Sequence, residues 1–524
     1  MDVSSITGTG GGLRPEAPAA PRALSVPVRP LARRIAVKTR LLALALRLGA
    51  VAAAPSASAA GSTDTAQGAF PISWTQCPDR PEVQCGTLRV PLDWARPRGE
   101  KITLALARHR ATDPAHRVGA LFVNPGGPGG GGVLIATYAD QIFSPELVAR
   151  FDIVGVDPRG IVGSTPVTCR PGPQPGFTLF PRTEAQFAQM VRQNRELGRS
   201  CLEQTGPLLG HVDTVSVARD HEAVRIGLDE RAFNWLGLSY GTQIGANYAQ
   251  LFPRRVRAMV FDGALDHSAL SVGLLADEIA TVEDAFNRFT EWCRTTSTCA
   301  MAGQDVARAY DEIVTRADAS PMPVPGADHP VTGEDIRLTT PSYLEFKEPS
   351  VFEPVSGWVR LGAAIRDTLA GDASAFAIPP FQSPTERAFG ALAVACQDYA
   401  PEVRTFADMQ RRIQLGRYLA PHLQGGSQSW LINRCIGWPV PPANPPHPLN
   451  VHGVPPVLIV NATHDANTSY KWAHVVAAQI RRSVVFTRLG DGHTSYLVSP
   501  CTRAVVDRYL VDRVIPGPDE VCTD

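Results

Sequence analysis

The sequence has no excess of charge of either sign, since 50 Lys and Arg residues balance 50 Asp and Glu residues. Such a balance gives no electrostatic reason for binding nucleic acid or an anionic membrane surface. A long apolar segment is lacking too, because Arg47 interrupts the apolar run at 41–54. That run is too short to span a bilayer. We therefore expect no nucleic-acid partner and no stable membrane anchor.

Motifs for metal and phosphate binding are also lacking. The ten cysteines contain no CxxC pair, which is the spacing typical of zinc sites. The glycine-rich segment 124–130 is interrupted by proline and is not followed by the GK[ST] of a phosphate-binding loop. We expect neither a metal ion nor a cofactor.

The composition favours a large folded core. Hydrophobic residues make up 44% and charged residues 19% of the 524 residues, so bulk disorder is not expected. The chain is longer than one ordinary domain and suits a core that carries an inserted second domain. Its 46 prolines and 45 glycines predict long, ordered connections between elements.

The ten cysteines form an even set of neighbours in the sequence. Five local disulfides would suit an oxidising compartment, whereas the alternative is a set of buried free thiols in the cytosol. The neighbouring pairs are Cys77 with Cys85, Cys169 with Cys201, Cys293 with Cys299, Cys396 with Cys435, and Cys501 with Cys522.

The N-terminal region predicts export. A basic stretch between Arg29 and Arg40 precedes the apolar run, and Ala57-Ser58-Ala59 is a small-residue cleavage site. We expect a secreted protein that is cleaved after Ala59. Residues 1–28 form a Gly/Pro/Ala-rich extension that a signal peptide does not need.

Short apolar runs alternate with helical stretches over the first half of the chain, which predicts a mostly parallel, doubly wound α/β sheet. Residues 267–450 instead show helical periodicity, and the alternation resumes after them. We read this region as a helical lid inserted into the sheet. The predicted segments are 1–59 (extension and signal peptide), 70–266 (core, first part), 267–450 (lid) and 451–524 (core, C-terminal part).

The segment Gly237-Leu238-Ser239-Tyr240-Gly241 is a GxSxG motif. It follows an apolar strand and precedes a helix, which is the context of the nucleophile elbow in the α/β-hydrolase fold. We predict Ser239 as a nucleophile; the alternative is a structural Gly/Ser turn. In this fold the oxyanion donors are the N–H after the serine and one from a glycine-rich loop. The candidates are Tyr240 and Gly127 (or Gly126).

The base and its acid follow from chain order, because this fold places the acid and then the histidine after the serine. His493 lies in a loop after the expected strand 484–489. His474 falls within a helix, and His464 would crowd the best acid. Asp465 follows the expected strand 457–461 and is the predicted acid. Asp491 is a rival, but two residues from His493 on one loop it is poorly placed to orient the ring.

These motifs together resemble the bacterial secreted tripeptidyl aminopeptidases, α/β hydrolases related to the proline iminopeptidases. The resemblance covers about Trp74 to Cys522 and includes the opening strand 85–93, the oxyanion loop 124–130, the turn Asp157-Pro158-Arg159-Gly160 and the acid loop 465–473. The sequence departs from the family pattern at Val162, Ala466 and Ser469. Pro125 stands where proline iminopeptidases carry a histidine, which argues against that activity. Asp157 and Arg159 are interpreted as structural.

The resemblance implies a monomeric serine exopeptidase that removes short N-terminal peptides, tripeptides above all, through an acyl-enzyme. Its partner would be a peptide with a free N-terminus, whose ammonium calls for carboxylates or carbonyls from the lid; the available acidic residues are Glu345, Glu348 and Asp398. The alternatives are a carboxylesterase or lipase-type hydrolase and an inactive binding module. An epoxide hydrolase or dehalogenase would carry Asp in place of Ser239.

Overall fold

The computed structural model describes residues 70–170, 176–327, 329–351, 353–377 and 386–523. The predicted signal peptide at 1–59 lies outside these residues. The described residues all fall within one compact unit. Within the described part of the chain, no helix has the length and apolar character needed to cross a membrane.

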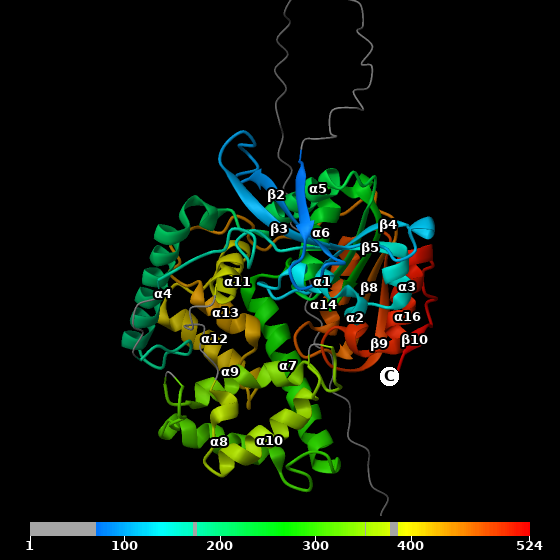
Figure 1. The fold of residues 1–524 in the computed structure, drawn as a ribbon. Coiled ribbons are helices and arrows are strands. Elements are labelled where there is room, and N and C mark those ends of the chain that lie inside the picture. Colours follow the sequence, from blue (N-terminus) through cyan, green and yellow to red (C-terminus); the bar gives the residue numbers. More distant parts are fainter. Residues whose placement is uncertain (1–69, 171–175, 328, 352, 378–385, 524) are drawn as a thin grey trace, which may run out of the picture. The chain divides into compact units, whose positions relative to one another are not determined.

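A ten-stranded sheet runs in the order β1-β2-β3-β5-β4-β6-β7-β8-β9-β10 (Figure 1). The pairs β1–β2, β2–β3 and β3–β5 are antiparallel, and the pairs from β5 to β10 are parallel. The strands are β1 (Ile72–Gln76), β2 (Gln84–Pro91), β3 (Lys101–His109), β4 (Gly119–Asn124), β5 (Phe151–Val156), β6 (Phe233–Leu238), β7 (Val256–Asp262), β8 (Val457–His464), β9 (Ser483–Asp491) and β10 (Val521–Cys522).

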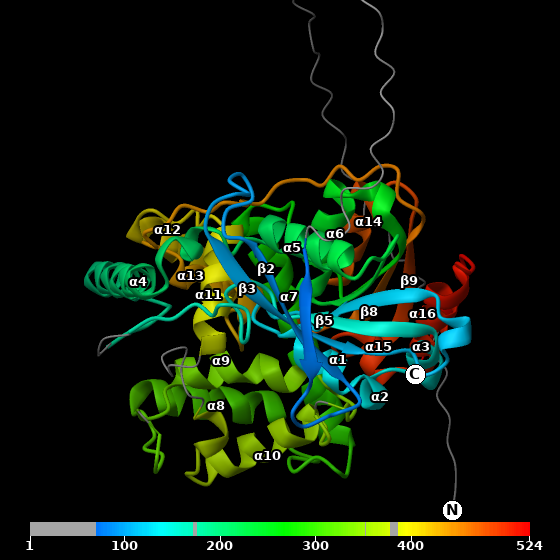
Figure 2. The ribbon, with the colours of Figure 1, turned by 45° about the horizontal axis from the view of Figure 1, so that its top comes forward.

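Helices cover both faces of this sheet, so every residue of β4, β5 and β6 is buried. The two layers bury separate apolar clusters and are seen on opposite sides of the strands in Figure 2. One layer contains α5 (Thr214–Gly227), α6 (Tyr240–Leu251) and α14 (Tyr470–Gln479); the other contains α1 (Gly132–Thr137), α2 (Ala139–Ile142), α3 (Pro145–Arg150), α15 (Ser495–Val498) and α16 (Pro500–Asp512). The fold is that of an α/β hydrolase, as predicted.

Between β7 and β8 the chain forms a helical region. Its helices are α7 (Ser271–Thr295), α8 (Val306–Ala319), α9 (Gly333–Leu344), α10 (Gly357–Leu369), α11 (Glu386–Asp398), α12 (Phe406–Leu419) and α13 (Ser427–Arg434). Helices α7 to α10 share an apolar cluster of their own. Helix α4 (Glu184–Thr205) precedes β7 in sequence but packs on α12 through Phe187 and Phe406. The boundaries of a separate lid at 267 and 450 stay a prediction.

The helix starts follow local sequence signals. Thr183 and Thr405 cap α4 and α12 with their side chains, and each accepts from the amide three residues further on. In both helices the third residue, Gln186 or Asp408, bonds back to the cap, which satisfies two otherwise free donors.

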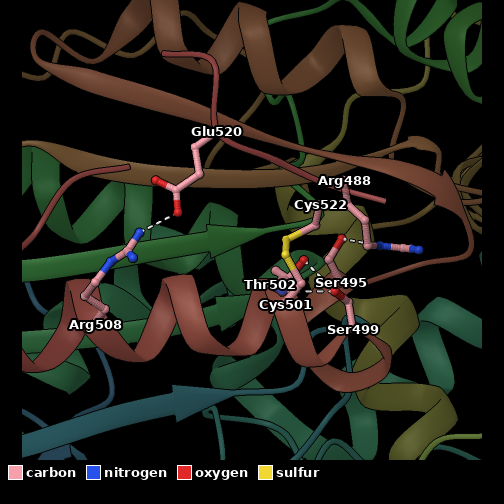
Figure 3. The surroundings of a disulfide bond; sticks show 8 residues. All are labelled: Arg488, Ser495, Ser499, Cys501, Thr502, Arg508, Glu520 and Cys522. Carbon is pink, nitrogen blue, oxygen red and sulfur yellow. Dashed lines mark hydrogen bonds and ion pairs between the residues drawn. A yellow bond between two sulfur atoms is a disulfide. The ribbon is translucent and has the colours of Figure 1, made fainter. Parts of the chain in front are cut away.

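Five disulfides join the same cysteine pairs that are neighbours in the sequence. Cys396–Cys435 links α11 to the turn after α13. Cys501–Cys522 links α16 to the edge strand β10, beside the ion pair of Arg508 with Glu520 at 2.6 Å (Figure 3). The short strand β10 is thereby attached to α16 by a covalent bond and an ion pair.

Candidate active site

Ser239 occupies a sharp turn between β6 and α6. Its φ of 53° and ψ of −125° are a conformation that L-residues rarely adopt. The turn is tight enough to require glycine on both sides: a Cβ on Gly237 would lie 2.4 Å from the Gly241 carbonyl oxygen, and one on Gly241 would lie 2.8 Å from that of Asn124. Strain of this kind is concentrated at functional sites. The local geometry is that of a nucleophile elbow.

The glycine-rich loop after β4 approaches the elbow closely. Gly126 has a φ of 96°, and a Cβ there would lie 2.7 Å from the Ser239 Cβ. The Gly126 N–H donates to Asn124 Oδ1 at 2.9 Å, so this donor is already engaged. Gly127, with a φ of 113°, lines the cavity that also contains Ser239. These contacts favour Gly127 over Gly126 as an oxyanion donor.

Asp465 and His493 meet at the carboxyl ends of β8 and β9. His493 Nδ1 lies 2.9 Å and 3.0 Å from the two carboxylate oxygens of Asp465. The same carboxylate accepts from the amides of Asn467 and Thr468, both at 2.8 Å, and from Thr468 Oγ1 at 2.9 Å. Both side chains are buried. Asp465 is thus fixed by several donors, one of which is the histidine ring.

Burial and charge oppose each other in this pair. Burial alone would raise the pKa of Asp465, but His493 and the surrounding donors outweigh it and hold that pKa below its usual value. Burial alone would lower the pKa of His493, but the carboxylates of Asp465, Glu345 and Asp262 outweigh it and raise that pKa. The surroundings therefore stabilise an imidazolium, which is the state a general base reaches when it takes a proton.

The rival acid and histidines are engaged elsewhere. Asp491 pairs with Arg288 of α7 and with Lys347 Nζ at 2.8 Å, so its carboxylate binds two cations from the helical region. His464 Nδ1 lies 2.7 Å from Asp284, and His474 lies within α14. Arg159 is buried and forms an ion pair with Asp220 at 2.6 Å, which agrees with a structural role.

A cavity of about 350 Å³ brings the predicted groups together. Ser239, His493 and Gly127 all line it, and Thr468 contributes from the acid loop. Much of the remaining wall is apolar and consists of Pro125, Leu134, Ile135, Leu238, Leu265, Phe346 and Leu497. Among the residues that the structure describes, no group of three His, Cys, Asp or Glu side chains is arranged to hold a metal ion.

Of the three acidic residues predicted to bind a substrate amine, only Glu345 lines this cavity. Glu348 is exposed and Asp398 is completely buried; neither contributes to the wall. Asp398 accepts from the Thr214 amide at 3.0 Å and from Asn444 Nδ2 at 2.8 Å, and burial raises its pKa to about 7. Its carboxylate therefore ties α11 to α5.

Glu278 of α7 also lines the cavity, with 1% of its surface exposed. It is not among the residues predicted from the sequence. Its position offers a signal, because it falls on the apolar stripe of Leu274, Leu275, Ile279 and Val282, all buried. An acidic residue on the buried face of a helix needs a partner or a function.

Two family models match parts of the chain, and known proteins are similar to it over most of its length. A family model described as "TAP-like protein" matches residues 422–522, and one for the alpha/beta hydrolase fold matches 119–313. The chain is 30% identical over 483 residues to "Serine protease Hip1" of Mycobacterium tuberculosis (86% of this chain, 91% of that protein). It is 31% identical over 480 residues to "Tripeptidyl aminopeptidase" of Streptomyces lividans (86% of each), and 32% identical over 494 residues to "Carboxylesterase B" of M. tuberculosis (88% and 92%).

Proposed function

The chain belongs to the tripeptidyl aminopeptidase family of α/β-hydrolase serine hydrolases, and from this premise we infer that it releases short N-terminal peptides, tripeptides above all, from peptide substrates. Ser239 is the proposed nucleophile, His493 the base and Asp465 the acid that orients it.

The observation that carries this proposal is the presence of two acidic side chains, Glu278 and Glu345, in the wall of the cavity that contains Ser239 and His493. A free N-terminus carries a positive charge at neutral pH. A cation in the cavity is attracted by the negative charge of these carboxylates, whereas a neutral acyl chain gains nothing from it. The cavity is therefore suited to a substrate that combines apolar groups with an ammonium.

The proposed reaction is acyl transfer to water. The Ser239 hydroxyl attacks the scissile carbonyl while His493 takes its proton, and Asp465 holds the ring so that the reactive nitrogen faces the serine. The N–H groups of Gly127 and Tyr240 stabilise the oxyanion. His493 then gives its proton to the leaving amine, and a water molecule releases the acyl group by the same steps in reverse order.

An esterase is the second candidate. Its support is the apolar part of the cavity wall and the similarity to a carboxylesterase. An inactive binding module is disfavoured because the residues proposed as nucleophile, base and acid are all in place.

A panel of chromogenic substrates tests the proposal. One-, two- and three-residue peptides attached to the same aromatic amine are compared with simple acyl esters of the matching phenol. We expect the highest kcat/KM with the three-residue peptide, because binding along the cavity contributes only when the substrate fills it. Hydrolysis of the esters alone, with no peptide cleaved, would contradict the peptidase and leave the esterase.

A further inference from the structure

Asp262, the last residue of β7, bonds to two different parts of the site. Its carbonyl oxygen accepts from the Ser239 amide at 2.8 Å. Its carboxylate accepts from the amides of Ser495 at 2.9 Å and Tyr496 at 2.7 Å, which follow His493 by two and three residues. The side chain is completely buried. One residue thereby connects the nucleophile turn to the loop that carries the base.

The chain at this point touches the proposed triad. The next residue, Gly263, has a φ of 70°, and a Cβ there would lie 3.1 Å from His493 Cε1 and 3.5 Å from Asp465 Oδ2. Any side chain would crowd the histidine ring. The end of β7 is therefore packed against the proposed catalytic groups, and Asp262 is close enough for its charge to act on His493.

We propose that Asp262 is a positioning residue for hydrolysis: it sets the place of His493 relative to Ser239 through hydrogen bonds to the backbone on both sides of the site. This inference rests on the proposed roles of Ser239 and His493. Buried acceptors with good donors hold a loop in one arrangement, and small displacements of a catalytic group are costly to rate.

The sign of the pH effect follows from the groups around His493. Asp465, Glu345 and Asp262 all raise the pKa of His493, and Glu278 lines the same cavity. Burial raises the pKa of Asp262 itself to about 6, with the two amide donors acting in the opposite direction. Removing one negative charge from this set lowers the pKa of His493. The base then becomes neutral at a lower pH.

The test is the rate at which a fluorophosphonate labels Ser239, measured against pH in the full-length protein. We expect Asp262→Asn to lower the maximal labelling rate at least about tenfold. The pH at which labelling reaches half of its maximum should also fall, by about half a pH unit or more, because the pKa of His493 is lower. Asp507→Asn is the matched control, because Asp507 is also buried and accepts from the same residue through the Tyr496 hydroxyl at 3.1 Å. This control should keep the wild-type profile.

A second pair of variants covers the case in which Asp262→Asn does not fold. Ser495 is the first residue of α15, where the fixed φ of proline suits a helix. Ser495→Pro removes the amide donor to Asp262, while Ser495→Ala removes only the hydroxyl. We expect slower labelling of Ser495→Pro than of Ser495→Ala.

Three results would overturn the inference: a wild-type profile for folded Asp262→Asn, the same losses in Asp507→Asn, or equal labelling of the two Ser495 variants. Failure of the wild-type protein to be labelled would instead remove the proposed nucleophile and base, and the inference with them.

Discussion

Two residues of the proposed site other than glycine have a positive φ. Ser239 has a φ of 53°, and Thr494, which follows His493, has a φ of 58°. Such conformations cost of order 1–3 kcal/mol each and persist where the surroundings hold them in place. Here the bonds from Asp262 to Ser239, Ser495 and Tyr496 do so on both sides.

At the residue scale, the sequence is informative about the proposed triad because the nucleophile, acid and histidine of this fold occur in a fixed order along the chain. Ser239, Asp465 and His493 each follow the end of a strand, and apolar runs in the sequence predict those strands. The amine-binding residues have no such rule. Charge alone pointed equally to Glu345, Glu348 and Asp398. Only the packing of α7 and of the segment after α9 brings Glu278 and Glu345 to the cavity wall.

Ser239→Ala should abolish fluorophosphonate labelling and lower turnover by several orders of magnitude, since it removes the attacking oxygen. Asp465→Asn should cost less, because the serine and the oxyanion donors remain. Labelling and steady-state kinetics measure both effects, with circular dichroism to verify folding. A large loss from Asp491→Asn together with a small one from Asp465→Asn would reverse the acid assignment.

At the element scale, the helical region contacts both loops of the proposed site. Asp284 and Arg288 of α7 pair with His464 and Asp491, the last residues of β8 and β9, directly before the loops that carry Asp465 and His493. The Glu345 carbonyl accepts from the His493 amide at 2.7 Å. Helical periodicity predicted the helices but not these contacts, because periodicity gives the buried face of a helix and not its partner.

The Cys396–Cys435 disulfide should stabilise this region. It closes a segment with a sequence separation of 39 residues. The double variant Cys396→Ala/Cys435→Ala should lose about 2–4 kcal/mol of unfolding free energy in urea. Cys77→Ala/Cys85→Ala is the control; its separation is 8 residues, and its loss should be smaller by about 1 kcal/mol. Equal or reversed losses would contradict the loop-entropy account.

At the scale of the whole molecule, the disulfides and the N-terminal motif both favour an oxidising compartment. We expect protein recovered from the culture medium to begin at Ala60, with residues 1–59 removed. Mass spectrometry of the mature N-terminus measures this directly. A chain found only in the cytosol, with residues 1–59 intact, would contradict export. The predicted monomer can be tested on the same material by sedimentation.

The central proposal is that the cavity selects a free N-terminus, and the most direct measurement compares a chromogenic tripeptide with its N-acetylated form. Acetylation removes the ammonium and with it the charge attraction to the carboxylates of Glu278 and Glu345, a loss of a few kcal/mol. We expect kcat/KM to fall at least about a hundredfold, since each factor of ten is about 1.4 kcal/mol. Glu278→Gln or Glu345→Gln should reduce the ratio of kcat/KM for the free tripeptide to kcat/KM for the acetylated one. Activity on the free peptide should also decline as its amine, with a pKa of about 8, loses its proton. Equal values of kcat/KM for the two peptides would contradict the aminopeptidase proposal, and the protein would then be a serine hydrolase of another specificity.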